Sequence, residues 1–543
     1  MIQGLPSRWD EVADVVVVGS GGAALAAATL AADGGARVLV VEKGPQLGGT
    51  TAVSGGVIWI PQNHHMRAAG LADSREEALA YVRRLAMGGE QDPALLEVAI
   101  DTAPEMLAYL EANTPVRMML VPAFPDYYVA YDAPGKKAGG RAVEPVPYAV
   151  GAELPEWASR LASRTTMASL GGTTTLAEDL GRVPRDEAEI ARRAANDVRT
   201  KGAALIGRLF KGLLARGVET RLETPARELV VAAGAVVGVR CEAAGKSRLF
   251  GARRGVVLAC GGFEWNRELV RAFIGHDLYP VSPPHNEGDG LLMAMEAGAA
   301  LHNMASYWGT GAMLDPEITR DGEPVPHFDA ARGMTGTLIV NQRGVRFVNE
   351  NVPYNDFPRA FGAFDPARLE FPNRAPAWMI FDQSVKDSMQ ILSVEPGKPA
   401  PAWVPHAATI PELAPRIGIT PEVLATTVDR FNDGARRGVD PDFGREVGFQ
   451  GGKLGPLGAG PYYAISIYPG TLGTNGGPRI DADARVKSAR GGLIPGLYAA
   501  GNTAANVFGW AYPSGGGTLC NAFTMGYRAG RHAAAQPPRS LGN

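Results

Sequence analysis

Cysteine is scarce in this chain of 543 residues. Only Cys241, Cys260 and Cys520 occur, and none forms a CxxC pair. A disulfide framework is therefore excluded, and the composition fits a reducing cytoplasm. The charge is also nearly balanced, with 53 Lys and Arg against 56 Asp and Glu and a net charge of −3. This balance gives no reason to expect nucleic acid or another polyanion as a partner.

Metal-binding and membrane-spanning patterns are missing too. The eight histidines are scattered, and the adjacent His64 and His65 are expected to point in different directions, so no metal site is predicted. The chain start lacks the charged and apolar regions of a signal peptide. The apolar stretch 15–32 contains Gly-Ser-Gly-Gly and is interpreted as a strand and a helix, so no transmembrane segment is predicted. We expect a cytoplasmic protein, and leave open whether its surface touches a membrane.

What the chain does have is glycine, with 69 residues in all and glycine-rich motifs near both ends. Residues 14–18 are apolar and β-branched, which is typical of a buried parallel strand. Gly19 permits the tight turn after the strand, and Gly21 lets a pyrophosphate approach the backbone. Ala23 opens the following helix, whose N-terminal amides face the phosphates, and Ala24 is small enough for that helix to pack on the sheet.

The ribose acid follows a second apolar strand, residues 37–41. Glu42 ends this strand at the position where a carboxylate accepts hydrogen bonds from ribose hydroxyls. A second polar glycine segment, 48–56, comes directly afterwards. An NAD site does not need such a segment, whereas an extended FAD runs its flavin-side phosphate and ribitol past it. The sequence therefore predicts non-covalent FAD.

Further candidate cofactor-binding residues lie in this segment and in later glycine-rich turns. They are Lys43, Gly49, Thr50, Thr51, Ser54, Gly55, Gly56, Gly261, Gly262, Asp289, Gly501, Asn502, Gly517, Thr518 and Leu519.

The predicted fold class is α/β. We expect a Rossmann-like, doubly wound parallel sheet of the glutathione-reductase type in an FAD-binding domain of residues 1–306 plus 476–543. Within it, 106–200 is rich in proline and poor in pattern, and is expected to be an irregular insertion. Residues 307–475 contain more Pro, Trp and Phe, and are expected to form an inserted α+β catalytic cap domain.

Four motifs carry a family resemblance. They are residues 344–350 (GVRFVNE), 472–477 (LGTNGG), 496–502 (GLYAAGN) and 517–518 (GT). With them the chain resembles the fumarate reductase / 3-ketosteroid dehydrogenase superfamily of flavoproteins, and most closely the 3-ketosteroid Δ1-dehydrogenases. Fumarate reductases place an arginine acid just after the RFVNE segment, where this chain has Tyr354. Segment 468–475 also lacks their histidine, which argues against fumarate as the substrate.

The resemblance implies roles for several tyrosines. Tyr512 and the Gly516 N–H are expected to polarise the substrate ketone, and Tyr354 to act as the base. Tyr127 or Tyr128 is expected to assist the base, and the choice between them is open. The role of Tyr468 is also open, because related 4-ene-forming steroid dehydrogenases use a tyrosine from its segment.

The chemistry can be stated without the resemblance. Oxidising a saturated carbon near a carbonyl needs two donors on the oxygen, a base for the α proton and a hydride acceptor at the β carbon, here FAD N5. A phenol with a pKa of about 10 is a poor base at neutral pH, and lowering that pKa by three units costs about 4 kcal/mol. A neighbouring phenol or amide donor is expected to supply part of this.

We therefore expect an FAD-dependent oxidoreductase acting on CH–CH groups that introduces a C=C bond next to a ketone, with a 3-ketosteroid as the main candidate substrate and 1-dehydrogenation as the reaction. The open alternatives are a smaller cyclic ketone such as cyclohexanone, 4-ene-forming steroid dehydrogenation and, in another class, a fumarate-reductase-like enone or enoate reductase. The expected partners are an apolar cyclic ketone or steroid and an electron acceptor such as a quinone.

Overall fold

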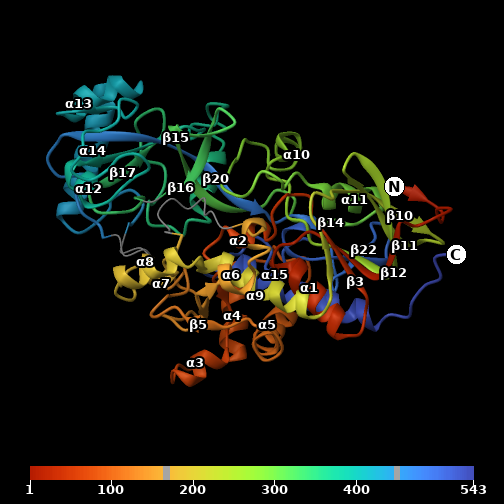
Figure 1. Ribbon diagram of the computed structural model, residues 1–543. Helices are drawn as coiled ribbons and strands as arrows, with labels where there is room; N and C mark the ends of the chain where they lie inside the picture. The colour runs from red at the N-terminus through yellow and green to blue at the C-terminus, as the bar shows by residue number, and fades with distance from the viewer. Residues whose placement is uncertain (163–171, 330, 446–452, 543) are drawn as a thin grey trace.

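The computed structural model describes residues 1–162, 172–329, 331–445 and 453–542. Two sheets organise these residues, one near the chain termini and one under helices α12–α14 (Figure 1). The helices are α1 Gly22–Asp33, α2 Gly49–Ala52, α3 His64–Ala68, α4 Arg75–Ala86, α5 Pro93–Asn113, α6 Val150–Glu153, α7 Leu176–Asp179, α8 Glu187–Ala195, α9 Lys201–Ala215, α10 Arg267–Phe273, α11 Asp289–Glu296, α12 Gln383–Ser388, α13 Ile410–Leu413, α14 Pro421–Arg436 and α15 Gly517–Ala535.

The first sheet has the order β1-β10-β11-β12-β2-β3-β9 in the described part of the chain, with β23 paired to β12 and β22 to β23. Its strands are β1 Ile2–Gln3, β2 Glu11–Val18, β3 Val38–Val41, β9 Glu219–Arg221, β10 Ala226–Ala232, β11 Ala235–Ala243, β12 Lys246–Leu258, β22 Arg485–Lys487 and β23 Leu493–Ala499. Strands β2, β3, β9, β12 and β23 are paired in parallel. The α/β class is thus confirmed, although the sheet is mixed and not wholly parallel.

The antiparallel part of this sheet has a local cause. Strands β10 and β11 are joined through Ala233 and Gly234, which both have positive φ, as a tight hairpin turn with the twist of the flanking strands requires. Parallel pairing instead needs a crossover, and α1 provides it between β2 and β3.

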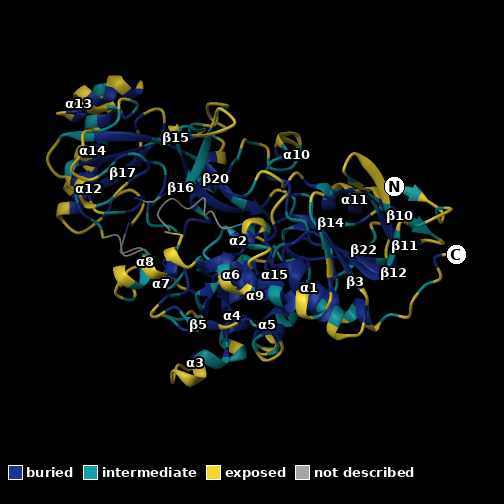
Figure 2. Ribbon diagram, in the orientation of Figure 1, coloured by how far each residue is buried: buried dark blue, intermediate teal, exposed yellow. Residues whose placement is uncertain are grey.

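Helix α1 packs closely against the C-terminal helix α15, and most residues of both are buried (Figure 2). The contact depends on small residues. A Cβ on Gly526 would lie 2.3 Å from the Ala23 carbonyl oxygen, and one on Gly530 would lie 2.1 Å from the Ala27 carbonyl oxygen. The two ends of the chain therefore share one core beneath the first sheet.

The second sheet has the order β16-β15-β20-β18-β17 in the described residues, and β13 and β19 also pair with β20. Its strands are β13 Tyr279–Pro280, β15 Tyr307–Arg320, β16 Glu323–Phe328, β17 Thr337–Val340, β18 Ala377–Asp382, β19 His406–Ala407 and β20 Tyr462–Thr474. Most of it comes from the range predicted as the cap, but β13 comes from the range predicted as the FAD domain. The domain boundaries themselves remain a prediction.

The segment 106–200, expected to be irregular, contains more structure than the prediction allowed. Helix α5 continues through its start to Asn113, and helices α6, α7 and α8 follow. The small strands, including those outside this segment, are β4 Ile58–Trp59, β5 Met118–Leu120, β6 Ala142–Pro145, β7 Tyr148–Ala149, β8 Val198–Arg199, β14 Leu301–His302 and β21 Gly477–Pro478. Several of these elements have four residues or fewer, too short for a periodic sequence pattern to reveal them.

In the described part of the chain, no helix is both long and apolar enough to cross a membrane.

Candidate active site

One cavity of about 1190 Å³ is lined by both predicted glycine regions and by residues of the second sheet. Sites for a single small ligand usually enclose ~300–1,000 Å³. This cavity exceeds that range, and its lining changes from glycine-rich turns to apolar and aromatic side chains. It therefore has room for a cofactor and a substrate side by side.

The cofactor half begins at the turn between β2 and α1. Gly19 has φ +107°, and a Cβ there would lie 2.4 Å from the Ala259 carbonyl oxygen, so only glycine fits. A Cβ on Gly21 would meet only Thr51 Oγ1 at 3.7 Å and the Gly48 carbonyl oxygen at 3.9 Å. Because the protein would tolerate a side chain at Gly21, the small residue there keeps space for a ligand at the start of α1.

Glu42 lies at the end of β3 as predicted. Its carboxylate accepts hydrogen bonds from the Ser20 hydroxyl at 2.6 Å and the Gly44 N–H at 2.7 Å. Burial raises the pKa of this carboxyl, and these two donors oppose the rise. The carboxylate is thus fixed at the cavity wall, in position to receive ribose hydroxyls.

The cavity brings together most of the predicted cofactor residues. The predicted residues that line it are Gly19, Gly21, Ala23, Glu42, Lys43, Gly49, Thr50, Thr51, Ser54, Gly55, Gly56, Gly261, Asp289, Gly501, Asn502, Thr518 and Leu519. Ala24, Gly262 and Gly517 lie behind the wall instead. The fully buried Ala24 packs in the core, and Cβ atoms on Gly262 and Gly517 would meet Thr474 and Pro513.

The donor set fits an extended dinucleotide such as FAD. Helix α15 starts at the cavity, where Gly516 precedes its first turn with φ +94°. The hydroxyl of Thr518 is buried there and has no hydrogen-bond partner among the described residues. A buried polar atom without a partner at a cavity wall is a place for a ligand atom, and the N-terminal end of a helix favours negative charge.

Three tyrosines meet in the other half of the cavity. The Tyr354 hydroxyl donates a hydrogen bond of 3.0 Å to the Tyr512 hydroxyl. The ring of Tyr127 lies 5.2 Å from the ring of Tyr354 and 5.7 Å from that of Tyr512, measured between centroids. All three side chains line the cavity and belong to one buried cluster. The predicted catalytic tyrosines are therefore neighbours, although they come from distant parts of the chain.

Burial controls the acidity of this cluster. It raises the pKa of Tyr354 well above its ordinary value, and the neighbouring Tyr127 and Tyr512 raise it further. Burial also raises the pKa of Tyr127 and of Tyr512. For Tyr512, hydrogen bonds from Tyr354 and the Gly516 N–H oppose the rise. Burial thus favours the neutral form of all three phenols, which is opposite to the lowered pKa of the base expected from the sequence.

Gly516 is positioned by its neighbours as well as by its own conformation. A Cβ at this residue would lie 2.5 Å from the Val57 carbonyl oxygen. The Gly516 carbonyl accepts a hydrogen bond of 3.2 Å from the Trp59 N–H, which fixes the turn against β4. Its N–H faces the Tyr512 oxygen, so the two predicted donors lie at the same point of the cavity.

The loop that carries Tyr127 is held by a buried charge that the sequence analysis missed. The carboxylate of Asp126 accepts hydrogen bonds from the Trp59 indole at 2.8 Å, the Lys137 N–H at 2.9 Å and the Arg141 guanidinium at 2.7 Å. Asp126 and Arg141 are 2% and 1% exposed. Tyr127 itself donates its N–H to the Pro513 carbonyl. This network fixes the backbone from which Tyr127 enters the cavity.

Tyr128 and Tyr468 do not line the cavity, although Tyr128 packs against the cluster. The Tyr128 hydroxyl donates a hydrogen bond of 2.5 Å to Asp356, and its side chain does not line the cavity. Tyr468 packs against Tyr279, with ring centroids 4.4 Å apart and ring planes tilted by 41°, and also lies outside the cavity lining. The structure therefore places Tyr127 at the cavity wall, and places Tyr128 and Tyr468 outside the lining; the catalytic roles of all three stay predictions.

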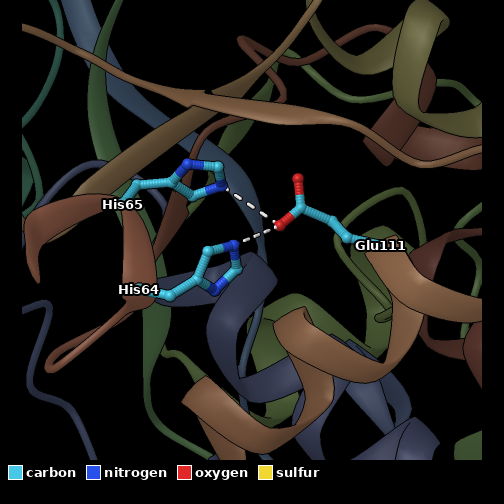
Figure 3. Close-up of side chains that lie close together, drawn as sticks. All are labelled: His64, His65 and Glu111. Atoms are coloured by element: carbon cyan, nitrogen blue, oxygen red, sulfur yellow. Dashed lines mark hydrogen bonds and ion pairs between the residues drawn. The ribbon is translucent and has the colours of Figure 1, made fainter. Parts of the chain in front are cut away.

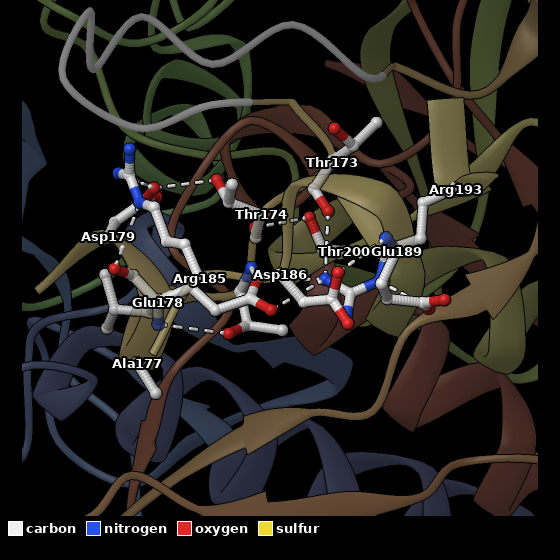
Figure 4. A network of polar contacts seen from close by, with 12 residues as sticks. Thr173, Thr174, Ala177, Glu178, Asp179, Arg185, Asp186, Glu189, Arg193 and Thr200 are labelled. Carbon is white, nitrogen blue, oxygen red and sulfur yellow. Dashed lines mark hydrogen bonds and ion pairs between the residues drawn. The ribbon is translucent and has the colours of Figure 1, made fainter. Parts of the chain in front are cut away.

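A polar network reaches the cavity wall through Asp179 (Figure 4). Asp179 lines the cavity, accepts a hydrogen bond of 2.7 Å from the Thr174 hydroxyl and pairs with Lys201 at 2.5 Å. Glu178 caps the start of α7 and pairs with Arg193 at 2.9 Å. Only short polar runs of sequence contribute here, so no motif signalled the network.

The apolar part of the wall is formed by Phe124, Leu176, Phe328, Met389 and Leu472, which the sequence analysis also did not assign. Beyond them lies a buried ion pair, in which Arg332 Nε donates to Asp329 Oδ2 at 2.5 Å. Arg332 is 4% exposed, and its guanidinium lies over the Phe357 ring. The lining therefore combines these apolar side chains with a buried charged pair.

Comparison with known proteins gives consistent matches. The family model described as FAD binding domain matches residues 14–519. The chain is 38% identical over 549 residues to 4-oxocyclohexanecarboxylate 2-dehydrogenase of Sinomonas cyclohexanicum, covering 96% of this chain and 93% of that protein. It is 37% identical over 568 residues to 3-oxosteroid 1-dehydrogenase of Mycobacterium tuberculosis, covering 96% and 98%.

Among solved structures, the chain is similar to 3-ketosteroid Δ1-dehydrogenase from Sterolibacterium denitrificans, whose crystal structure contains 1,4-androstadiene-3,17-dione. The TM-score is 0.88 at 33% sequence identity, and the match covers 97% of this chain and 100% of that one.

Proposed function

This chain belongs to the flavoprotein family described as FAD binding domain, and we propose that it desaturates the ring of a cyclic ketone, with a 3-ketosteroid as substrate and 1-dehydrogenation as the reaction. It is an FAD-dependent dehydrogenase acting on CH–CH groups. The observation that carries the assignment of roles is the convergence of Tyr127, Tyr354 and Tyr512 in the cavity that the cofactor-binding turns also line.

Tyr512 and Gly516 bind the carbonyl oxygen in this proposal. Tyr512 and Gly516 both line the cavity, and in this proposal the Tyr512 hydroxyl and the Gly516 N–H donate to one substrate oxygen. Two such donors stabilise the negative charge that develops on the oxygen when the α proton leaves. The hydrogen bond from Tyr354 to Tyr512 makes the Tyr512 hydroxyl a better donor than burial alone would allow.

Tyr354 removes the α proton. The α carbon is bonded directly to the carbonyl carbon, so a base for its proton must lie within a few ångströms of the group that binds the oxygen. The distance of 3.0 Å between the Tyr354 and Tyr512 hydroxyls meets this requirement. FAD, when bound, supplies the hydride acceptor for the β carbon.

Tyr127 assists the base. Its side chain lines the cavity beside Tyr354, and its hydroxyl interacts with that of Tyr354. A phenolate at position 354 is unfavourable in this buried cluster unless a neighbouring hydroxyl stabilises it. Tyr127 is placed to donate that hydrogen bond as the proton leaves Tyr354.

The apolar wall of Phe124, Phe328 and Leu472 favours a steroid skeleton. A second candidate is a cyclohexanone that carries a carboxylate. It is favoured by Arg332 at the wall, which has no hydrogen-bond acceptor for Nη2 among the described residues, and by the relative that acts on 4-oxocyclohexanecarboxylate. In both cases the ketone binds Tyr512 and Gly516, and only the opposite end of the molecule differs.

Each turnover removes one proton and one hydride from the ketone, so two electrons must leave the flavin afterwards. We propose a quinone or a similar small acceptor for them. A cytoplasmic location fits the three free cysteines, Cys241, Cys260 and Cys520. Contact with a membrane surface is proposed only as the route by which a sterol or a quinone would reach the protein.

The substrate can be tested with an artificial electron acceptor. The kcat/KM for 4-ene 3-ketosteroids is compared with the values for 4-oxocyclohexanecarboxylate and cyclohexanone, and the product double bond is located by mass spectrometry and NMR. The proposal expects the steroids to give the highest kcat/KM and a new double bond at C1–C2. A preference for 4-oxocyclohexanecarboxylate that is lost in Arg332→Met would replace the steroid with the second candidate.

A further inference from the structure

Two histidines and a glutamate meet away from the cavity, between α3 and the C-terminal part of α5 (Figure 3). Nε2 of His64 lies 2.8 Å from Oε2 of Glu111, and Nε2 of His65 lies 3.1 Å from the same oxygen. The two imidazole rings are side by side, with centroids 4.2 Å apart. The expectation that the adjacent histidines point in different directions is therefore wrong.

The first turn of α3 explains this convergence. Successive residues of a helix are rotated by about 100° around its axis, which separates their Cα–Cβ bonds. An imidazole reaches far enough from the backbone for its two side-chain torsions to compensate for the rotation. Asn63 accepts a hydrogen bond from the Met66 N–H and fixes the start of α3, so both rings leave the same turn toward Glu111.

We propose that His64, His65 and Glu111 bind a divalent transition-metal ion, with Zn²⁺ as the best fit. Two imidazole nitrogens and a carboxylate oxygen are ligands that Zn²⁺ accepts at about 2.0–2.2 Å. The three ligand atoms lie within 4.8 Å of one another, so one ion reaches all of them after small side-chain movements. Two imidazoles make Ca²⁺ and Mg²⁺ poor candidates, since both prefer oxygen ligands.

Glu111 is prepared for this role by its own contacts. Its other oxygen, Oε1, accepts a hydrogen bond of 2.8 Å from the Met118 N–H at the start of β5. This bond orients the carboxylate and leaves Oε2 directed at the histidines, as a supporting hydrogen bond does around many metal ligands.

The histidines keep this group accessible. The side chains of His64 and His65 are 38% and 24% exposed, and that of Glu111 is 13% exposed. Three protein ligands with one side open leave a fourth position for water or an exogenous ligand. None of the three lines the cavity, so the ion would tie α3 to α5 and would not take part in the oxidation.

The test uses purified holoenzyme without a histidine tag, treated with a chelator and titrated with Zn²⁺ alone. Isothermal titration calorimetry and metal analysis after dialysis measure stoichiometry and affinity. The variants are His64→Ala, His65→Ala and Glu111→Gln, which keeps an acceptor for the Met118 N–H. His406→Ala is the matched control, because His406 is an exposed histidine on β19, far along the chain from the group. Flavin absorbance and circular dichroism confirm that each variant is folded.

The proposal expects one Zn²⁺ per chain for the wild type and for His406→Ala. It expects at least about tenfold weaker binding for each of the other three variants. It also expects Zn²⁺ to raise the melting temperature of the wild type but not that of His64→Ala. Absence of stoichiometric binding, or equal affinity in all variants, overturns the proposal. Neither readout depends on the oxidation of a ketone.

Discussion

The hydroxyl groups of Tyr354 and Tyr512 lie 3.0 Å apart although 158 positions separate them in the chain. Tyr512 belongs to the segment leading into α15, whereas Tyr354 follows the RFVNE motif in the range predicted as the cap. A base and an oxyanion donor for the same ketone need this proximity, because the α carbon is directly bonded to the carbonyl carbon. The relation between these two residues is the core of the proposed mechanism.

Replacing either hydroxyl is expected to abolish most turnover without loss of the flavin. Tyr354→Phe removes the base and is expected to lower kcat by about 10²–10⁴-fold. Tyr512→Phe removes one of two donors to the oxygen and is expected to lower kcat by about 10²–10³-fold. Steady-state rates and the flavin content of each variant provide the measurement. Undiminished rates in both variants would refute the assignment of roles.

The rate is expected to increase with pH. Burial and the neighbouring phenols hold the pKa of Tyr354 well above its ordinary value, so only a small fraction is ionised near neutral pH. The phenolate is the active base, and its fraction grows roughly tenfold per pH unit while the pH stays below the pKa. A log plot of kcat/KM is therefore expected to rise between about pH 7 and 9 with a slope near one. A flat profile would mean that proton removal by Tyr354 does not limit kcat/KM.

Tyr128 and Tyr468 provide matched controls for Tyr127. Tyr468→Phe is expected to leave kcat/KM within about twofold of the wild type, since the hydroxyl that it removes lies outside the cavity lining. Tyr127→Phe is expected to lower kcat, because it removes the donor beside Tyr354. Tyr128→Phe removes only the bond to Asp356 and is expected to act through stability. A larger loss of kcat in Tyr468→Phe than in Tyr127→Phe would reverse these roles and revive 4-ene formation.

Asp126 is expected to matter for both stability and rate. Asp126→Asn removes one of the two buried carboxylates that pair with Arg141, the other being Asp73, and is expected to lower the free energy of unfolding by about 1–3 kcal/mol. Asp277→Asn breaks the exposed pair with Arg271 and is expected to change it by about 0–1 kcal/mol. Urea unfolding followed by circular dichroism compares the two. Equal effects would show that the Asp126 network does not hold the loop before Tyr127.

A substitution at Gly21 tests cofactor binding without disturbing the folded protein. Gly21→Ala creates no close contact within the protein, so the variant is expected to fold with an unchanged melting temperature in its flavin-free form. The added methyl group occupies space at the start of α1 and is expected to weaken FAD binding. Gly362→Ala is the control, since its Cβ would come no nearer than 3.6 Å to His276 and Gly362 is outside the cavity lining. Wild-type FAD affinity in Gly21→Ala would place the pyrophosphate elsewhere.

The glycine turns could be predicted from the sequence because their demands are local. Gly19 needs a positive φ and a close approach to Ala259, and such requirements appear directly as residue type and spacing. Glu42 could be predicted for the same reason, since it ends a strand next to that turn. The resemblance to known flavoproteins then indicated Tyr354 and Tyr512.

The remaining site residues depend on tertiary packing. Tyr127 and Tyr128 are adjacent in the sequence. Tyr127 packs in the tyrosine cluster and Tyr128 bonds to Asp356, and only these tertiary contacts determine which side chain enters the cavity. Tyr468 lies on β20 four residues before Leu472, which does line the cavity. Four residues of an extended strand span about 13 Å, so a side chain on the same strand can be far from the site. No sequence pattern encodes these positions.

The most direct test of the account is an anaerobic mixture of the purified enzyme with a 4-ene 3-ketosteroid, followed by flavin absorbance and product analysis. The account predicts that the oxidised flavin is bleached and that one equivalent of a ketone with a new C1–C2 double bond forms per flavin. Bleaching is expected to be at least about 10²-fold slower in Tyr354→Phe. A flavin that stays oxidised with every saturated or 4-ene ketone, but is reoxidised by an enone after chemical reduction, would contradict the account and make the protein a reductase.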